Sequence, residues 1–395
     1  MLDRNFKIFQ ERFGSDCFDF IPESFTLPEE RHLLEDRLQR DESIWIVKPV
    51  TGYGGQGIKI VTKANEIVRE NDAKVIVQRY LENPFLISGL KFDIRLYALI
   101  TCIDPLTLYL YNDGLVRFAS VKFSTDRDNL NNKFIHITNS SVNKMNPHFL
   151  YNRKINGVSG HKWTFKALLK YLNDNGHNTT ELWGEIRRIT LKTILCAREE
   201  IIKNFKSVKS DYTCYKLLGL DIMLDSSLKP WLLEVNNFPS FEPEELDRSV
   251  NEHLLVEMFN IAGFHVTEPL DPQTRQLLMK KMKMESFENF RPETYLRNDE
   301  NSPLYVNESS LLNEFNLTLK SVKILTRFEE EINQTSNFSI LFLSEVPSLA
   351  SCQTKADKLL MSWEATYGKD RTSGRELLIK LCNFFKVSEG KQGIN

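Results

Sequence analysis

The sequence predicts an α/β protein with mostly antiparallel sheets and a helical C-terminal region. Short runs of β-branched and aromatic residues bounded by turn residues, such as Ser43–Val47 and Lys74–Tyr80, predict strands near the start of the chain. Apolar residues at helical spacing over Glu181–Phe205 predict a long amphipathic helix. Beyond about Pro269 the pattern favours helices interrupted by polar stretches. A chain of 395 residues is too long for one small domain and suits two or three packed units.

An antiparallel meander is predicted from strands at Asp93–Ile103, Leu108–Tyr111 and Leu115–Phe123. Its turns are Asp104-Pro105 and Asn112-Asp113-Gly114, and the second is a strong hairpin signal because Asp-Gly suits the tight turns that join such strands. The other predicted elements, in chain order, are helices at Asp3–Phe13 and Glu29–Gln39 around an extended segment at Phe18–Leu27, a strand at Ile58–Val61, a helix at Trp163–Leu172, strands at Leu217–Leu224 and Trp231–Asn236, and a final helix near Arg375–Phe385.

The composition excludes several classes of protein. Lys and Arg total 51 against 53 Asp and Glu, a net charge of −2, whereas a general nucleic-acid or membrane binder is usually more basic. No uncharged stretch approaches the roughly 20 residues that a membrane helix needs, and the charged start does not resemble a signal peptide. The six cysteines are scattered without a CxxC pair. We therefore expect reduced thiols, an intracellular, cytoplasmic location, and no nucleic-acid or membrane partner.

A glycine-rich loop follows the lysine that ends the strand at Ser43–Val47. Lys48 leads into Gly52, Gly54, Gly55 and Gly57, and another strand comes directly after. Glycines let backbone N–H groups approach phosphate oxygens, and the lysine supplies a point charge. The segment lacks the ending of a Walker A loop and the helix of a Rossmann turn. A phosphate-binding loop and a flexible hairpin with a surface lysine therefore both remain open for this segment taken alone.

Three charged residues alternate on one predicted strand. Lys91, Asp93 and Arg95 share a face because side chains alternate along a strand, and three charges cannot face an apolar core without partners. Arg117, beyond the Asn-Asp-Gly turn, is expected to join them. The pattern favours a polar wall for a charged ligand over a self-contained salt-bridge cluster.

Two acids and an amide lie on the hairpin formed by Leu217–Leu224 and Trp231–Asn236. Glu234 and Asn236 project to one face, and Asp221 on the partner strand can reach it. Carboxylate and amide oxygens suit Mg²⁺, which takes few protein ligands and leaves room for phosphates and water. The alternative is that nearby Lys or Arg side chains satisfy both acids. We expect this to be the less favoured reading, because no basic residue adjoins them on that face of the hairpin.

The segment from His136 to Lys144 is rich in hydrogen-bonding side chains, which is typical of a capped loop or of a site for ribose or an amino acid. No Ser-His-Asp or Cys-His pattern and no protein-kinase signature is present. Taken together, the four segments indicate ATP-dependent chemistry with the nucleotide held between two β-rich lobes.

Long stretches of the chain resemble the tubulin–tyrosine ligase-like family of ATP-grasp ligases, and within it the glutamate-adding, polyglutamylase branch. The matching stretches are RFGSDCFDFIPESF, WIVKP, VIVQRYLENPFLISGLKFDIRLYALIT, YNDGLVRFAS, HITNSSVNK, GHKW and LLGLDIMLDSSLKPWLLEVNNFPSF, in family order from about Phe6 to Phe264. A weaker likeness in LTLKSVKILTRFEEE and KLLMSWEATYGKD is to the extension of the branch that places the first glutamate.

The resemblance implies an ATP-grasp-like two-lobed fold with mostly antiparallel sheets and a helical C-terminal extension. The implied parts are a remnant of an N-terminal lobe at 1–14, a central ATP-grasp lobe at 15–85, a catalytic ATP-grasp lobe at 86–268 and the extension at 269–395. Carried over by position, the ATP site comprises Lys48, Gly54, Gly55, the hinge Gln78-Arg79-Tyr80-Leu81, Lys91, Asp93, Thr138 and Asn139. Arg95 and Glu234 are implied to be catalytic, Arg117, Ser141 and Lys162 to hold the incoming glutamate, and Asp221, Glu234 and Asn236 to bind Mg²⁺.

The implied activity is ATP-dependent addition of free L-glutamate to glutamate side chains in acidic protein tails, most of all those of tubulin, at microtubules in the cytoplasm, with the cilium or basal body as a further location. Two departures stand against it. Gly54 replaces an arginine that is usual in the family, and the first lobe is expected to be shortened. A microtubule-binding protein that has lost catalysis and a glycine-adding ligase are therefore the alternatives, although Arg117 suits a donor with a side-chain carboxylate.

A basic segment is predicted in the C-terminal region. Arg275, Lys280, Lys281 and Lys283 fall close together, with apolar residues between them that can dock on the ligase core. The alternative is an ordinary solvated helix face. The functional hypothesis is that this basic segment binds an acidic polymer.

Overall fold

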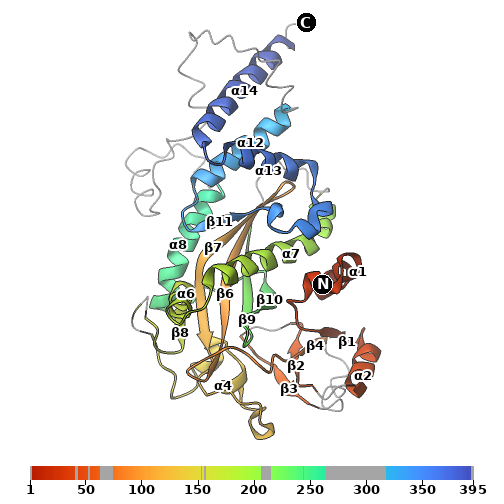
Figure 1. The fold of residues 1–395 in the computed structure, drawn as a ribbon, viewed down its shortest axis with the longest axis vertical. Helices are drawn as coiled ribbons and strands as arrows, with labels where there is room; N and C mark the ends of the chain where they lie inside the picture. The colour runs from red at the N-terminus through yellow and green to blue at the C-terminus, as the bar shows by residue number, and fades with distance from the viewer. Residues whose placement is uncertain are drawn as a thin grey trace. The chain divides into compact units, whose positions relative to one another are not determined.

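The computed structural model describes residues 2–40, 43–51, 54–62, 74–152, 154, 157–205, 215–242, 244–263 and 317–392. The predicted basic segment and Gly52 lie outside the described residues. The chain forms two compact units. Unit 1 comprises Met1–Ala98, Leu110–Lys203 and Leu217–Asn251, and unit 2 comprises Leu99–Tyr109, Asn204–Lys216 and Glu252–Asn395. Figure 1 shows the helices and strands of both.

A small antiparallel sheet lies in the N-terminal part of unit 1. Its order is β1-β4-β2-β3, from strands β1 (Ser24–Leu27), β2 (Trp45–Pro49), β3 (Lys59–Val61) and β4 (Val75–Arg79). Helices α1 (Leu2–Phe13) and α2 (Arg31–Arg40) precede and interrupt it, as predicted. Its alternating apolar residues form one core with Leu34 of α2, made of Phe25, Leu27, Trp45, Val47, Val61, Val75 and Val77.

A larger sheet has the order β10-β9-β6-β7-β11. Two long strands dominate it, β6 (Leu90–Ile103) and β7 (Leu106–Phe118). The part of β6 up to Ala98 and the part of β7 from Leu110 onward belong to unit 1, and the hairpin between them, Leu99–Tyr109, belongs to unit 2. The other strands are β9 (Lys216–Leu224), β10 (Pro230–Asn236) and β11 (Phe338–Leu341), while β5 (Leu86–Ile87) pairs with β6 and β8 (Lys162–Thr164) pairs with β7.

The predicted hairpin at Asn112-Asp113-Gly114 is wrong. Strand β7 runs through these residues without a break, so the only turn in this part of the meander is at Asp104-Pro105. Gly114 allows β7 to lie close to β6, because a Cβ at this position would lie 2.2 Å from the backbone oxygen of Arg95. Asp113 accepts hydrogen bonds from the backbone N–H groups of Gly114 and Lys166, at 2.8 and 3.0 Å. The Asp-Gly pair therefore marks tight packing within a strand.

The helices of unit 1 follow the predicted pattern with one shift. Helix α7 (Thr179–Phe205) matches the predicted long helix. Helix α6 (Phe165–Asp174) starts two residues later than predicted, because Lys162–Thr164 pairs with β7 as a strand and Thr164 caps the helix. The segment from His136 to Lys144, called the polar segment below, begins at the end of short helix α4 (Lys133–His136) and contains short helix α5 (Ser140–Asn143). Short helical turns η1 and η2 cover Ser15–Phe18 and Arg127–Asn129.

Unit 2 is mainly helical. Helices α12 (Leu319–Asn333), α13 (Lys355–Tyr367) and α14 (Arg371–Gln392) pack around one apolar core, and α8 (Glu245–Ile261) passes from unit 1 into unit 2. Two buried acids of α12 have charged partners, because Glu329 pairs with Arg371 and Arg375, and Glu331 pairs with Arg327. Short helical turns η4 and η5 lie at Leu343–Glu345 and Pro347–Cys352. The predicted fold class, α/β with antiparallel sheets, is confirmed. No helix among the described residues is long and apolar enough to cross a membrane.

Candidate active site

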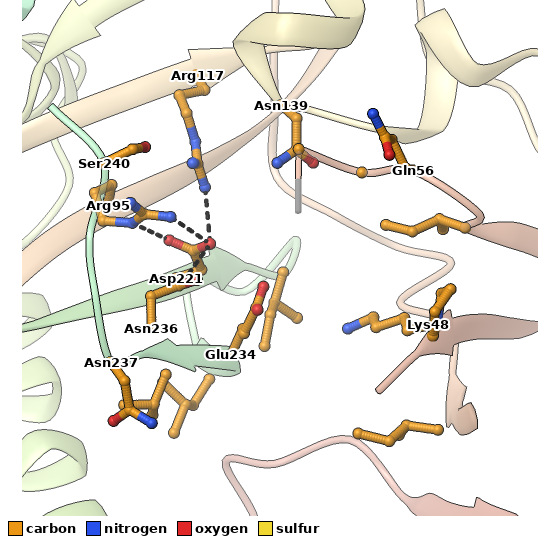
Figure 2. A pocket seen from close by; sticks show the side chains of 18 of the residues that line it. Lys48, Gln56, Arg95, Arg117, Asn139, Asp221, Glu234, Asn236, Asn237 and Ser240 are labelled. Atoms are coloured by element: carbon orange, nitrogen blue, oxygen red, sulfur yellow. Dashed lines mark hydrogen bonds and ion pairs between the residues drawn. The ribbon is translucent and has the colours of Figure 1, made fainter. Parts of the chain in front are cut away.

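A cavity of about 900 Å³ lies within unit 1, lined by residues of both sheets (Figure 2). The small sheet contributes residues of β1, β2 and β4, and the large sheet contributes residues of β6, β7, β8, β9 and β10. The glycine loop, the polar segment and the residues that follow β10 also line it. The predicted site residues that line it are Lys48, Gly54, Gly55, Gln78, Arg95, Arg117, Asn139, Ser141, Lys162, Asp221, Glu234 and Asn236.

The cavity is balanced in charge. Five Lys and Arg side chains line it, and so do five Asp and Glu side chains. A nucleotide and an acidic amino acid would both add negative charge to this site. Their joint binding therefore calls for an additional cation, which agrees with the expected Mg²⁺.

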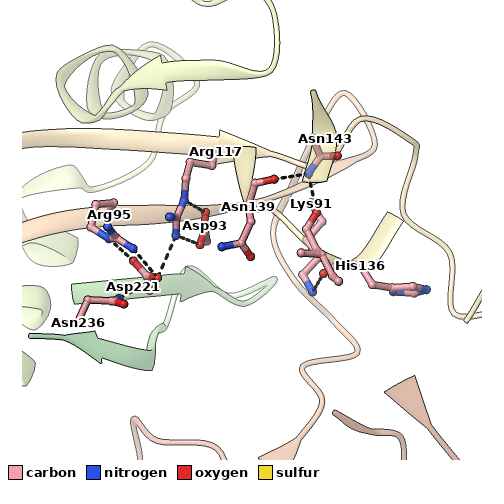
Figure 3. A network of polar contacts seen from close by, with 10 residues as sticks. Lys91, Asp93, Arg95, Arg117, His136, Asn139, Asn143, Asp221 and Asn236 are labelled. Carbon is pink, nitrogen blue, oxygen red and sulfur yellow. Dashed lines mark hydrogen bonds and ion pairs between the residues drawn. The ribbon is translucent and has the colours of Figure 1, made fainter. Parts of the chain in front are cut away.

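Two arginines and two aspartates form a buried network along the cavity wall (Figure 3). Arg95 donates from Nε and Nη2 to the two carboxylate oxygens of Asp221, at 2.5 and 3.0 Å. Arg117 donates from Nε to Asp93 at 2.9 Å, and its Nη2 contacts the second oxygen of Asp93 and also Asp221, the latter at 3.1 Å. All four side chains are buried. The predicted polar wall is therefore present, and its charges are paired.

This network controls the charge of Asp221. Burial alone would raise the pKa of the Asp221 carboxyl, but Arg117 and Arg95 outweigh that effect and hold its pKa well below the usual range. The expectation that no basic residue faces the two acids is wrong for Asp221. The arginines come from β6 and β7, which the pattern of the hairpin alone did not bring beside it.

Glu234 stands apart from this network. A β-bulge between Leu232 and Glu234 sets Glu234 opposite Asp221 in the β9–β10 pair. Its carboxylate makes no hydrogen bond or ion pair with any residue that the structure describes. The Glu234 side chain is accessible to water, yet partial desolvation in the cavity raises the pKa of its carboxyl. The negative charge of Asp221 raises this pKa further. Figure 2 shows Glu234 and Lys48 pointing toward the same space from opposite walls.

The oxygen donors at this point fit a magnesium ion. Glu234 offers an unpaired carboxylate, and the Asn236 amide, which donates to Asp221 at 3.3 Å, keeps its oxygen for another partner. Asp221 adds a second carboxylate whose charge the arginines share. Among the described residues no cluster of three or more His, Cys, Asp or Glu suits a metal. Two carboxylates and one amide are instead the sparse set that Mg²⁺ accepts when phosphate and water complete its ligands.

The glycine loop is fixed by contacts with the polar segment. Gly54 and Gly55 adopt left-handed backbone angles, with φ of 65° and 79°. The Ser141 hydroxyl donates to the backbone oxygen of Gly54 at 3.1 Å, and a Cβ on Gly54 would lie 3.1 Å from the same Ser141 oxygen. Beside this loop, Lys48 donates to the Gln78 side chain at 2.6 Å. Glycine at position 54 therefore suits this conformation, which residues with a side chain rarely adopt.

Several predicted nucleotide residues do not line the cavity. Lys91 and Tyr80 are buried and do not line the cavity, and neither do Arg79, Leu81, Asp93 and Thr138. The Lys91 ammonium donates to the Tyr80 hydroxyl at 2.8 Å and to the backbone oxygen of His136 at 2.9 Å. Burial lowers the pKa of Lys91 to about 7, with Asp93 opposing the shift and Lys48 adding to it.

Lys162, which is predicted to hold the incoming glutamate, lies among acidic side chains that the sequence analysis did not identify. Its ammonium contacts both oxygens of Asp247, at 2.7 and 2.8 Å, and Glu244 at 3.2 Å. Glu242 lies 3.9 Å away and also pairs with Lys144. The sequence signal was the acidic run just before and within the first turn of α8, a position where carboxylates favour a helix start. Arg117 and Lys162 are thus both charge-compensated within the protein.

The tubulin-tyrosine ligase family model matches residues 1–274 of this chain. The chain belongs to the tubulin-tyrosine ligase family. It is 34% identical to the human tubulin monoglutamylase TTLL4 over 403 residues, covering 96% of this chain and 33% of the relative. It is 32% identical to the mouse tubulin polyglutamylase TTLL5 over 361 residues, covering 86% of this chain and 27% of the relative. It is 30% identical to the Caenorhabditis elegans tubulin polyglutamylase ttll-4 over 396 residues, covering 94% of this chain and 62% of the relative.

Membership of the tubulin-tyrosine ligase family confirms the predicted resemblance, including its likeness to the glutamate-adding branch, and with it the ATP-grasp-like fold. The family's chemistry is that of an ATP-dependent ligase. The chain spans about a third of the length of the curated mammalian relatives it matches. The roles assigned to single site residues stay predictions.

Proposed function

We propose that this chain is an ATP-dependent ligase that adds free glutamate to the side-chain carboxylates of glutamates in acidic protein tails, with tubulin as the acceptor. The names of the relatives support the donor and the acceptor. The observation that carries the proposal is Glu234, a carboxylate without a partner among the described residues, opposite Lys48 in a cavity that the paired arginines also line.

The proposed reaction has two steps. The acceptor carboxylate attacks the γ-phosphorus of ATP, which releases ADP and leaves an acyl-phosphate. The amine of free glutamate then attacks the acyl carbon, an amide bond forms, phosphate leaves, and the amine gives up a proton to water. No covalent bond to the protein is needed, so positioning and charge neutralisation supply the rate enhancement.

Each group of side chains has a part in this scheme. Lys48 and the backbone of Gly54 and Gly55 bind phosphate oxygens. Arg95, held in one orientation by Asp221, places its positive charge beside the transferred phosphoryl group. Glu234, Asp221 and Asn236 would hold Mg²⁺, which when bound neutralises phosphate charge.

The donor and acceptor assignments complete the proposal. Arg117, Ser141 and Lys162 hold the incoming glutamate, and the acids around Lys162 keep its ammonium in place. With these tails as acceptors, the proposed place of action is at microtubules in the cytoplasm, including those of the cilium or basal body. The division at residues 14, 85 and 268 into an N-terminal segment, two ATP-grasp lobes and a helical extension belongs to the same proposal.

Purified chain should be incubated with Mg·ATP, microtubules and one labelled amino acid at a time, either glutamate, glycine or tyrosine. We expect label in tubulin from glutamate only, with one ADP formed for each glutamate added. Label from glycine would instead favour a glycine-adding ligase. Co-sedimentation with microtubules without label and without ADP would make the chain a binding protein that has lost catalysis.

A further inference from the structure

Three buried side chains from three separate segments form a closed ring of hydrogen bonds. Tyr80 directly follows β4 of the small sheet, Lys91 lies on β6 of the large sheet, and His136 ends α4 in the polar segment (Figure 3 shows Lys91 and His136). Lys91 donates to the Tyr80 oxygen at 2.8 Å and to the His136 backbone oxygen at 2.9 Å. The ring closes between the Tyr80 oxygen and His136 Nδ1, at 2.9 Å.

The partners fix where each proton lies. His136 Nε2 is 3.1 Å from the backbone oxygen of Asn129, which can only accept, so Nε2 carries the proton. Nδ1 of the neutral ring is then bare and accepts the Tyr80 hydroxyl proton. The Tyr80 oxygen in turn accepts an N–H of Lys91. Burial and the charge of Lys91 lower the pKa of His136 to about 4, which keeps the imidazole neutral as this arrangement requires.

The ring is closed to solvent and packed on its sides. The exposed fractions of Tyr80, Lys91 and His136 are 4%, 3% and 3%. The Tyr80 ring stacks on Phe123, and His136 meets both rings edge-on. Water therefore cannot replace a lost partner without disturbing this packing, and removing one member leaves the others unsatisfied.

Each member of the ring stands close in sequence to a residue that lines the cavity. Tyr80 is two residues from Gln78, His136 is three residues from Asn139, and Lys91 is four residues from Arg95 on the same strand. The ring consequently ties together three walls of the cavity, namely the end of β4, the polar segment and strand β6. A structural network elsewhere in the fold would not have this relation to the site.

We propose that His136 is a positioning residue of the nucleotide site, which acts through Tyr80 on Lys91 and through its own backbone on the segment that carries Thr138 and Asn139. The proposal rests on the proposed function, because ATP is the ligand that these walls are expected to hold. His136 itself does not touch the nucleotide. Its effect is to hold the two β-rich lobes at the separation that ATP needs.

The test compares substitutions at His136 that do and do not keep the hydrogen bonds. His136→Phe removes both the acceptor and the donor of the ring, whereas His136→Gln keeps an amide oxygen and an amide N–H. The readouts are the dissociation constant for a fluorescent ATP analogue and the melting temperature. We expect about 10-fold weaker nucleotide binding for His136→Phe, because the ring loses the hydrogen bond between Tyr80 and His136. For His136→Gln we expect a change within about threefold.

Two further variants separate positioning from stability. Tyr80→Phe breaks the same ring, so it should weaken nucleotide binding about as much as His136→Phe, and the double variant should be no weaker than either alone. Tyr109→Phe is the matched control, because Tyr109 is a buried tyrosine of unit 2 whose hydroxyl donates to Glu331 at 2.9 Å. It should lower the melting temperature and leave nucleotide binding unchanged.

If His136→Phe binds the nucleotide as tightly as the wild type but has a lower melting temperature, the inference is overturned. The ring would then contribute to stability alone. If His136→Phe does not fold, Tyr80→Phe decides by the same criterion. Equal weakening by Tyr109→Phe would also overturn it. Absence of nucleotide binding in the wild-type chain would overturn the proposed function together with this inference, and that outcome is distinct from a difference confined to the variants.

Discussion

Replacement of Arg117 by alanine should lower both the stability of the protein and its affinity for glutamate. Arg117 and Asp93 are 9% and 4% exposed, and Arg117 is the charged partner that holds both oxygens of Asp93. Asp221 keeps Arg95 after the substitution, but Asp93 is left buried without its hydrogen-bonded ion-pair partner. Breaking a buried ion pair in this way costs about 3–5 kcal/mol, against a total stability of about 5–15 kcal/mol for a typical domain.

The stability part is measured by urea unfolding of Arg117→Ala beside the double variant that also carries Asp93→Asn. The double variant should recover most of the loss, because the orphaned charge is gone. Arg40→Ala is the control, since Arg40 forms an exposed ion pair with Asp36 on α2 and its loss should cost less than about 1 kcal/mol. A free energy of unfolding in Arg117→Ala equal to that of the wild type would refute the account of the buried network.

The donor part is measured by steady-state kinetics at a temperature where Arg117→Ala remains folded. Loss of a charge-assisted hydrogen bond is worth roughly 1.5–3 kcal/mol, so KM for glutamate should rise about 10- to 150-fold while KM for ATP changes much less. Equal effects on both substrates would place Arg117 in the nucleotide site or in the scaffold.

Three other outcomes are expected. Glu234→Gln should abolish glutamate addition and leave the melting temperature near that of the wild type, because it removes an unpaired charge; turnover near the wild-type rate at saturating Mg·ATP would contradict the metal assignment. The pKa of His136 is lowered to about 4 by burial and then by Lys91. The neutral imidazole should therefore contribute about 3 kcal/mol to the free energy of unfolding above about pH 6.5, and this contribution should be lost as the pH falls toward about 4. His136→Gln should lack that part of the pH dependence in urea unfolding, and an unchanged profile would show that the imidazole is not buried as neutral. Reversing Lys280, Lys281 and Lys283 of the basic segment to Glu should weaken salt-sensitive microtubule co-sedimentation and spare turnover on a short acidic peptide. Unchanged co-sedimentation would contradict the hypothesis that the basic segment binds an acidic polymer.

The fold was largely predictable because its strands and helices carry clear periodic patterns. The alternation in Trp45–Pro49 and Val75–Arg79 and the helical spacing in Thr179–Phe205 set these elements within a few residues of their observed bounds. The failure at Asn112-Asp113-Gly114 has a definite cause. Asp-Gly favours a turn only when nothing else fixes the glycine, and here Gly114 is required by the backbone of the neighbouring strand.

The candidate site was predictable in its residue types and less so in its pairings. Spacing alone placed Glu234 and Asp221 on one hairpin face, and the register confirms that they are opposite each other. Which charges pair depends on the order of strands in the sheet, which sequence spacing does not give. For that reason Arg95 and Arg117 beside Asp221, and Asp247 beside Lys162, emerge only from the three-dimensional structure.

The most direct test of the account follows the oxygen atoms of the acceptor. An acidic tail peptide with heavy-oxygen-labelled side-chain carboxylates is incubated with the chain, Mg·ATP and glutamate, and the peptide and the released phosphate are analysed by mass spectrometry. Because the acceptor carboxylate takes the phosphoryl group and then loses one oxygen with it, the account predicts one heavy oxygen in phosphate for each glutamate joined to a side chain of the peptide. Glutamate addition with unlabelled phosphate, or ATP consumption without any addition, would contradict it.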